Sequence, residues 1–141
     1  RYVCLGGGTV TWSIDNLDSI KSAIESGKFN NYQGICYDVE GYDDSDQTIL
    51  DKFEECFSAA KAKSLKNIIS TSHTGPFAGG DPKTIMEYFF SSENVDIISP
   101  QLYTCDYGTA NEYDPTSGLS WSDFANFYKN RKKSIKYYRT H

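Results

Sequence analysis

The chain has 141 residues, of which 38% are hydrophobic and 15% aromatic, so it holds enough apolar material for one globular domain and lacks the composition of a disordered protein. Its formal net charge of -5 argues against a nucleic-acid partner, because phosphate binding needs clustered Lys and Arg. No apolar run reaches about 18 residues, so the sequence predicts no membrane-spanning helix.

The first half of the sequence predicts two strands and two helices. Residues 2–5 form a short apolar run that is closed by glycines, and apolar residues at helical spacing predict a helix over about 14–26. A strand is expected over 32–40. A second stripe of apolar residues at helical spacing predicts a helix over about 45–63.

The second half continues this alternation. A strand is expected over 66–72, a helix over 82–90 that opens on a proline, and a fourth strand over 95–103. A long polar stretch follows, and then a helix that begins at about 120 and a short strand over 134–138. Strands that alternate with helices are typical of repeated βαβ units, so the expected fold class is α/β with a parallel sheet.

Polar residues and glycines gather where the predicted strands end. In parallel α/β folds, functional sites lie at the carboxyl ends of the strands, where the loops leading into the helices converge. The opposite strand ends carry no comparable set. The candidate site residues are therefore those at the carboxyl ends: Gly6, Gly7, Asp38, Glu40, His73, Gln101 and Tyr103.

Asp38 and Glu40 lie two residues apart at the end of the second predicted strand. Successive side chains of a strand point to opposite faces, so both carboxylates share one face with Cys36. Like charges this close raise the pKa of one group, and a carboxyl that stays protonated near neutral pH is what general-acid catalysis needs. The alternative is an ordinary strand end that turns into solvent. His73 has a similar alternative, as a histidine that only completes a strand end.

Three short motifs follow an order found in a known protein family. Gln33-Gly-Ile-Cys-Tyr-Asp-Val-Glu40 matches the third and fourth acidic positions of the pattern Asp-x-x-Asp-x-Asp-x-Glu. Cys4-Leu-Gly-Gly7 is similar to Ser-x-Gly-Gly, and Ser99-Pro-Gln-Leu-Tyr103 contains Gln-x-Tyr. Together they resemble glycoside hydrolase family 18, the chitinase group, and the resemblance spans residues 3–121.

This resemblance implies a parallel (β/α)8 barrel of the TIM type, incomplete in this chain, with residues 1–141 as a single partial domain that supplies the third to seventh strands. A closed barrel needs about 250 residues, so we expect completion by other chain segments or by self-association. The resemblance also implies a chitinase-like hydrolase of β-1,4-linked N-acetylglucosamine that uses no cofactor. The four cysteines fit an oxidising compartment, so a secreted protein is expected.

By the same resemblance, the mechanism is substrate-assisted and retaining. Glu40 would protonate the glycosidic oxygen, Asp38 would hold the acetamido N–H of the sugar, and Tyr103 would orient the acetamido carbonyl. The other candidates are expected on the wall of the substrate pocket: Gly6, Gly7, His73 and Gln101. A metal site on Asp38, Glu40 and His73 is not expected, because no paired His or Cys ligands accompany them.

Two cysteines depart from the family pattern. Cys36 replaces the middle Asp of the family, and Cys4 replaces the Ser that this Asp usually meets on the neighbouring strand. With the strand adjacency of the family, the two cysteines face each other, either as a disulfide or as two free thiols. Losing the middle Asp removes a group that can share a proton with Asp38. A non-catalytic relative with a glycan-binding or structural role is therefore the second hypothesis.

Overall fold

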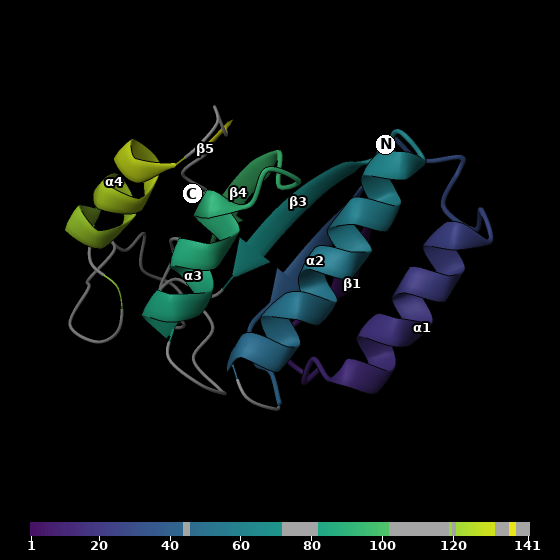
Figure 1. The fold of residues 1–141 in the computed structure, drawn as a ribbon, viewed down its shortest axis with the longest axis horizontal. Coiled ribbons are helices and arrows are strands. Elements are labelled where there is room, and N and C mark those ends of the chain that lie inside the picture. The colour runs from purple at the N-terminus through teal and green to yellow at the C-terminus, as the bar shows by residue number, and fades with distance from the viewer. Residues whose placement is uncertain (44–45, 72–81, 102–118, 120, 132–135, 138–141) are drawn as a thin grey trace, which may run out of the picture.

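The computed structural model describes residues 1–43, 46–71, 82–101, 119, 121–131 and 136–137. Within these residues, strands and helices alternate along the whole chain (Figure 1). The elements are β1 (Tyr2–Gly6), α1 (Ile14–Glu25), β2 (Gly34–Val39), α2 (Asp46–Ala62), β3 (Lys66–Thr71), α3 (Pro82–Ser91), β4 (Ile97–Pro100), α4 (Trp121–Asn130) and β5 (Lys136–Tyr137). The expected α/β class is confirmed.

The sheet is parallel, and its strand order follows the chain as β1-β2-β3-β4-β5. Each strand pairs with the next one along the sequence, so every connection advances the chain by one strand. Cys4 lies opposite Cys36, and Asp38 lies opposite both Gly6 and Ser70. Because the strands are parallel, all their carboxyl ends meet at one edge of the sheet.

The four described helices cover one face of the sheet (Figure 1). On this face, Ile35 and Tyr37 of β2 are fully buried. Aromatic rings from the helices pack over them: the ring centroid of Phe57 is 5.1 Å from that of Tyr37, and the centroid of Phe53 is 5.4 Å from that of Phe89. The alternation of apolar side chains in β2 and the helical stripe of α2 therefore build one shared core.

The opposite face of the sheet is not covered by any described helix. Tyr2 in β1 is 42% exposed, and Cys4 is exposed. Alternate side chains of the next three strands point to this face and are only half-buried: Cys36, Asp38, Ile68, Ser70, Ile97 and Ser99. The candidate carboxylates thus lie on the accessible side of the sheet, away from the aromatic core.

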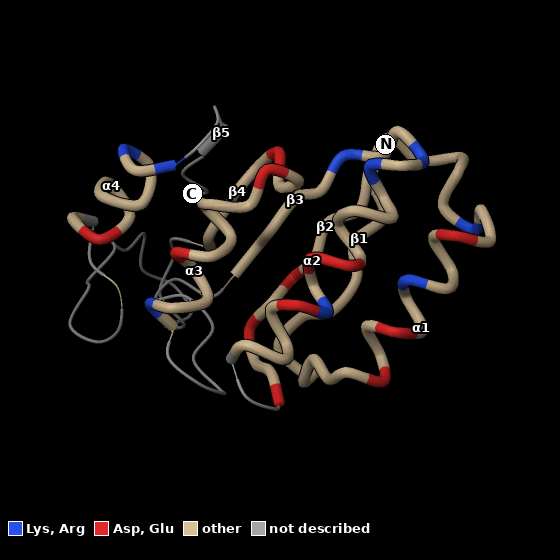
Figure 2. Tube along the Cα trace, in the orientation of Figure 1, with Lys and Arg blue, Asp and Glu red and all other residues tan. Residues whose placement is uncertain are grey.

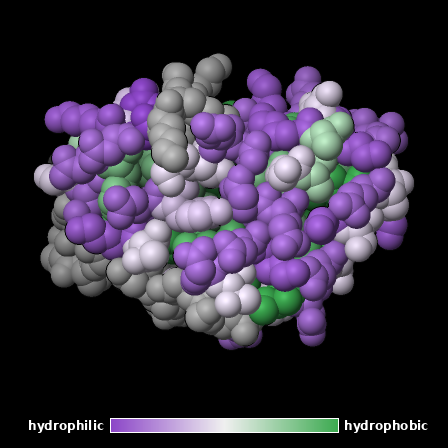
Figure 3. Space-filling view, viewed as in Figure 1, coloured by the Kyte–Doolittle hydropathy of each residue, from purple (hydrophilic) through white to green (hydrophobic). Residues whose placement is uncertain are grey.

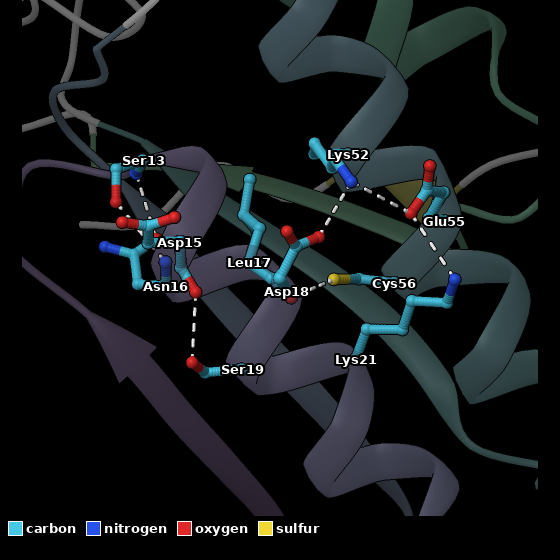
Figure 4. Close-up of polar contacts among 10 residues, drawn as sticks. All are labelled: Ser13, Asp15, Asn16, Leu17, Asp18, Ser19, Lys21, Lys52, Glu55 and Cys56. Carbon is cyan, nitrogen blue, oxygen red and sulfur yellow. Dashed lines mark hydrogen bonds and ion pairs between the residues drawn. The ribbon is translucent and has the colours of Figure 1, made fainter.

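A capping box at Ser13 and a glycine with positive φ define the two ends of α1. The Ser13 hydroxyl accepts a hydrogen bond from the Asn16 N–H at 3.3 Å, and the Asn16 side chain accepts one from the Ser13 N–H at 2.9 Å (Figure 4). This reciprocal cap fixes the first turn. After the last turn, Gly27 has a φ of 82°, a conformation that favours glycine. The predicted helix over 14–26 is confirmed to within a residue.

β4 begins later than the strand expected over 95–103. The Asp96 carboxylate accepts the Asn67 N–H at 2.9 Å, so a side chain takes the place of a main-chain acceptor at this position. Regular pairing therefore starts at Ile97, opposite Ile68. Pairing continues just beyond the strand, where the Gln101 N–H donates to the Thr71 carbonyl at 2.8 Å.

Charged residues of both signs lie along α1 and α2 (Figure 2), and the surface on this side of the molecule is largely hydrophilic (Figure 3). Lys52 pairs with Asp18 at 2.8 Å and with Glu55 at 3.6 Å, and Lys21 pairs with Glu55 at 3.4 Å (Figure 4). These ion pairs are exposed to solvent, so water and salt screen them and each contributes little to stability. No helix among the described residues is both long and apolar enough to cross a membrane.

Candidate functional site

The structure brings three of the predicted site residues together at the carboxyl edge of the sheet. Asp38 lies near the end of β2, Glu40 follows this strand, and Gln101 follows β4. The Gln101 side-chain Nε2 donates to Asp38 Oδ1 at 3.0 Å and to Glu40 Oε1 at 3.2 Å. Both hydrogens of one amide group are therefore used to hold the two carboxylates side by side.

Burial and charge both act on Asp38. Desolvation of the half-buried carboxyl, followed by repulsion from Glu40, raises the pKa of Asp38, while hydrogen bonds from Gln101 and Ser70 lower it. The net effect is upward, so Asp38 keeps its proton to a higher pH than an exposed aspartate. Compared with the unfolded state, the folded state therefore favours the protonated form of Asp38. The stability that this preference adds is fully present below the ordinary pKa of aspartate and is lost as the pH rises through the raised pKa.

Replacing Gln101 by alanine is expected to raise the pKa of Asp38 further, because it removes a hydrogen bond that stabilises the carboxylate. Carbon-13 NMR titration of the Asp38 carboxyl measures this shift. A matched control is Gln47→Ala, which removes an exposed amide–carboxylate bond to Asp51 of 2.8 Å in α2 and should leave the titration of Asp38 unchanged. A lower pKa of Asp38 in the Gln101 variant would contradict the assigned role.

The glycine turn after β1 packs against the two carboxylates. The Gly7 N–H donates to the Asp38 carbonyl at 3.1 Å. A Cβ added at Gly7 would lie 3.7 Å from Asp38 Oδ2, and one added at Gly8 would lie 3.1 Å from Glu40 Oε2. Gly7, and Gly8, which the sequence did not single out, thus lie beside the two carboxylates. Gly6 lies against the Asp38 carbonyl and the Trp12 ring, and the expected place of Gly6 and Gly7 on the wall of a substrate pocket stays a prediction.

Gly6 and Gly7 should respond differently to substitution by alanine. Both have positive φ angles, 97° and 116°, so either alanine strains the backbone by about 1–2 kcal/mol. At Gly6 the new Cβ would also lie 2.4 Å from the Asp38 carbonyl oxygen and 2.6 Å from the Trp12 ring. We expect Gly6→Ala to lower the free energy of unfolding by about 2–5 kcal/mol in total, since the clash adds an overpacking cost. Urea denaturation compares the two variants, and equal losses would contradict this geometry.

Trp12 anchors the strand end that carries the carboxylates. Its indole N–H donates to the Asp38 carbonyl at 2.9 Å. This oxygen therefore accepts two hydrogen bonds, one from Trp12 and one from the Gly7 N–H. Its main chain pairs with the next turn: the Trp12 N–H donates to the Gly41 carbonyl at 2.9 Å, and the Asp43 N–H donates to the Trp12 carbonyl at 2.7 Å. Trp12 is only 1% exposed. The sequence did not identify this role.

His73 and Tyr103 lie outside the described residues, as does Cys105. The expectation that Tyr103 lines the same sugar-sized pocket as Asp38 and Glu40 therefore stays a prediction. The two carboxylates themselves lie close together, because Gln101 donates a hydrogen bond to each of them.

Cys4 and Cys36 lie directly opposite each other in β1 and β2, and both are free thiols. Neighbouring strands are about 4.8 Å apart, within the Cα separation of up to about 7 Å that a disulfide tolerates. The predicted disulfide is therefore compatible with the backbone and stays a prediction. Cys56 is buried on α2, where its thiol donates to the Leu17 carbonyl at 3.2 Å.

Two other features of the described residues lie apart from this site. An open hollow of about 610 Å³ lies beside α1 and α2 on the helix side, and neither Asp38 nor Glu40 lines it. Within the described ranges, no group of three or more His, Cys, Asp or Glu side chains is arranged to hold a metal ion.

The chain was compared with models of protein families, with curated proteins and with solved structures. None of the three comparisons finds a match.

Proposed function

We propose that this chain carries the catalytic carboxylates of a chitinase-like glycoside hydrolase that cleaves β-1,4-linked N-acetylglucosamine. The observation that carries the proposal is the bridge from Gln101 to both Asp38 and Glu40 at the carboxyl edge of a parallel sheet. The sequence resemblance to family 18 adds the expected order of motifs around this pair.

Each carboxylate has a distinct role in the proposed reaction. Glu40 Oε1 accepts the Gln101 hydrogen bond, which leaves Oε2 to carry the proton that passes to the glycosidic oxygen. The acetamido oxygen of the substrate attacks the anomeric carbon as the bond to the leaving oxygen breaks. Asp38 accepts the acetamido N–H and stabilises the positive charge that develops. Water then adds to the anomeric carbon and gives its proton to Glu40.

We further propose that the sheet is a segment of a (β/α)8 barrel. Two observations support this. The strand order follows the chain without reversal, and the described helices lie on one face only. In a barrel of this kind, the site forms at the carboxyl rim, where Asp38 lies near the end of β2.

A second candidate function is glycan binding without catalysis. It is favoured by Cys36, which stands where the family has its middle Asp and leaves Asp38 without that proton-sharing partner. Calorimetric binding of chitobiose, measured beside turnover of a chromogenic chitobioside, separates the two functions. Turnover supports the hydrolase, binding without turnover at any pH supports the binding protein, and the absence of both contradicts the two proposals together.

A further inference from the structure

Two cysteines form a pair on the accessible face of the sheet. Cys4 in β1 and Cys36 in β2 are direct partners in the parallel register, so their side chains leave the sheet side by side. Cys4 is exposed and Cys36 is half-buried. Both thiols are free, and the exposed Cys4 gives a small molecule access to the pair.

The surroundings of the two thiols differ from those of Cys56. Burial first, and the neighbouring Cys4 thiol second, raise the pKa of Cys36 to about 12. Burial also raises the pKa of Cys56 to about 12, but Cys56 lies under α1 and donates to the Leu17 carbonyl. Because Cys4 is the exposed one of the three described cysteines, a reagent in solution reaches its thiol most easily. Cys36 is the only other described cysteine on the same face of the sheet.

We propose that Cys4 and Cys36 are a reversible redox pair that is oxidised by low-molecular-weight disulfides of the glutathione type. The Cys4 thiolate attacks one sulfur of the small disulfide. The S–S bond of that disulfide breaks, and one small thiolate leaves and takes up the proton that Cys4 lost. Cys36 then loses its proton, and its sulfur attacks Sγ of Cys4 and expels the second small thiolate, which takes up this second proton. Two electrons pass from the protein dithiol to the small disulfide, which becomes two thiols.

The position of the pair argues for reversibility. A bond between Cys4 and Cys36 would join two strands that are already hydrogen-bonded neighbours, at an exposed position. Exposed disulfides have higher reduction potentials than buried structural ones and are the labile ones. The pair also lies two residues before the glycine turn and two residues before Asp38, so its oxidation acts on the strand ends that carry the candidate site. The inference rests on the exposure of Cys4 in this chain and not on the proposed hydrolase function.

The experiment uses the folded wild-type chain in a series of glutathione buffers from fully reduced to fully oxidised. After acid quenching and alkylation of free thiols, trypsin releases residues 2–21 with Cys4 and residues 29–52 with Cys36. We expect the linked pair of these peptides, lighter by two hydrogen atoms than their sum, to rise from under a tenth to over nine tenths of the total. Return to the reduced buffer should reverse the change.

Single variants separate the two steps. In Cys36→Ser, Cys4 should stop at the mixed disulfide with one glutathione attached, whereas Cys4→Ser should form no link between the two peptides. Cys105→Ser, which removes the remaining cysteine outside the described residues, should leave the linked pair unchanged. Absence of the linked pair in the folded wild type, or its formation only after denaturation in urea, would overturn the proposal.

Discussion

Replacement of Glu40 by glutamine is expected to lower kcat for a chromogenic chitobioside by about 10²- to 10⁴-fold, the usual contribution of a general acid. This corresponds to about 3–5 kcal/mol of activation free energy. Glutamine has the same shape as glutamate and keeps a side-chain oxygen for the 3.2 Å bond from Gln101, so the site should hold its geometry. Only the transferable proton is lost.

The matched control is Glu25→Gln, which removes a carboxylate from the exposed end of α1. It should leave kcat and the melting temperature unchanged. Calorimetry should show that the Glu40 variant binds chitobiose with nearly wild-type affinity. A Glu40 variant with full turnover would place the acid on another residue.

Replacement of Trp12 by alanine is expected to lower the free energy of unfolding by about 3–5 kcal/mol. The indole is 1% exposed, and its ring centroid lies 5.4 Å from that of Phe53 and 5.9 Å from that of Tyr37. The variant also loses the 2.9 Å hydrogen bond to the Asp38 carbonyl. Urea denaturation measures the loss of stability, and the rate of chitobioside cleavage should fall as Asp38 shifts.

Trp12→Phe separates packing from hydrogen bonding. Phenylalanine keeps much of the ring contact with Phe53 but has no N–H for the Asp38 carbonyl. Because the Gly7 N–H still reaches that oxygen at 3.1 Å, the loss of the hydrogen bond should cost only about 1 kcal/mol beyond the smaller ring. A phenylalanine variant as unstable as the alanine variant would show that the indole acts through its hydrogen bond and not through packing.

The fold class followed from the sequence because its two periodicities are clear. Ile35 and Tyr37 alternate with Cys36 and Asp38 in β2, and the structure buries the first two under the helices and leaves the others half-exposed. Capping by Ser13 was less visible, since the partner that completes it is an asparagine and not the more common glutamate or glutamine.

Part of the candidate site also followed from the sequence. Parallel strands place their carboxyl ends at one edge, and this rule alone predicts that Asp38, Glu40 and Gln101 lie close together. The anchoring role of Trp12 could not be predicted in this way. Its partner is a main-chain carbonyl 26 residues away, and such a bond leaves no pattern of side chains along the chain. Ser70 was missed for a related reason, as one polar residue on the accessible face of β3.

The prediction that Cys4 and Cys36 face each other depended on the strand adjacency that the family resemblance implied. The spacing of the two cysteines in the sequence does not bring them together, whereas adjacency of their strands does, and the observed register places them as direct partners. Their oxidation state depends on the redox potential of the surroundings and is therefore a matter for the glutathione experiment.

The central claim is that Asp38 and Glu40 act on a sugar whose own acetamido group is the nucleophile. Its most direct test compares two chromogenic β-glycosides that differ only at C2, one with an acetamido group and one with a hydroxyl. The account predicts cleavage of the acetamido substrate that is faster by on the order of 10²-fold or more, with the β anomer released first. Equal rates for the two substrates, or cleavage of neither, would contradict it.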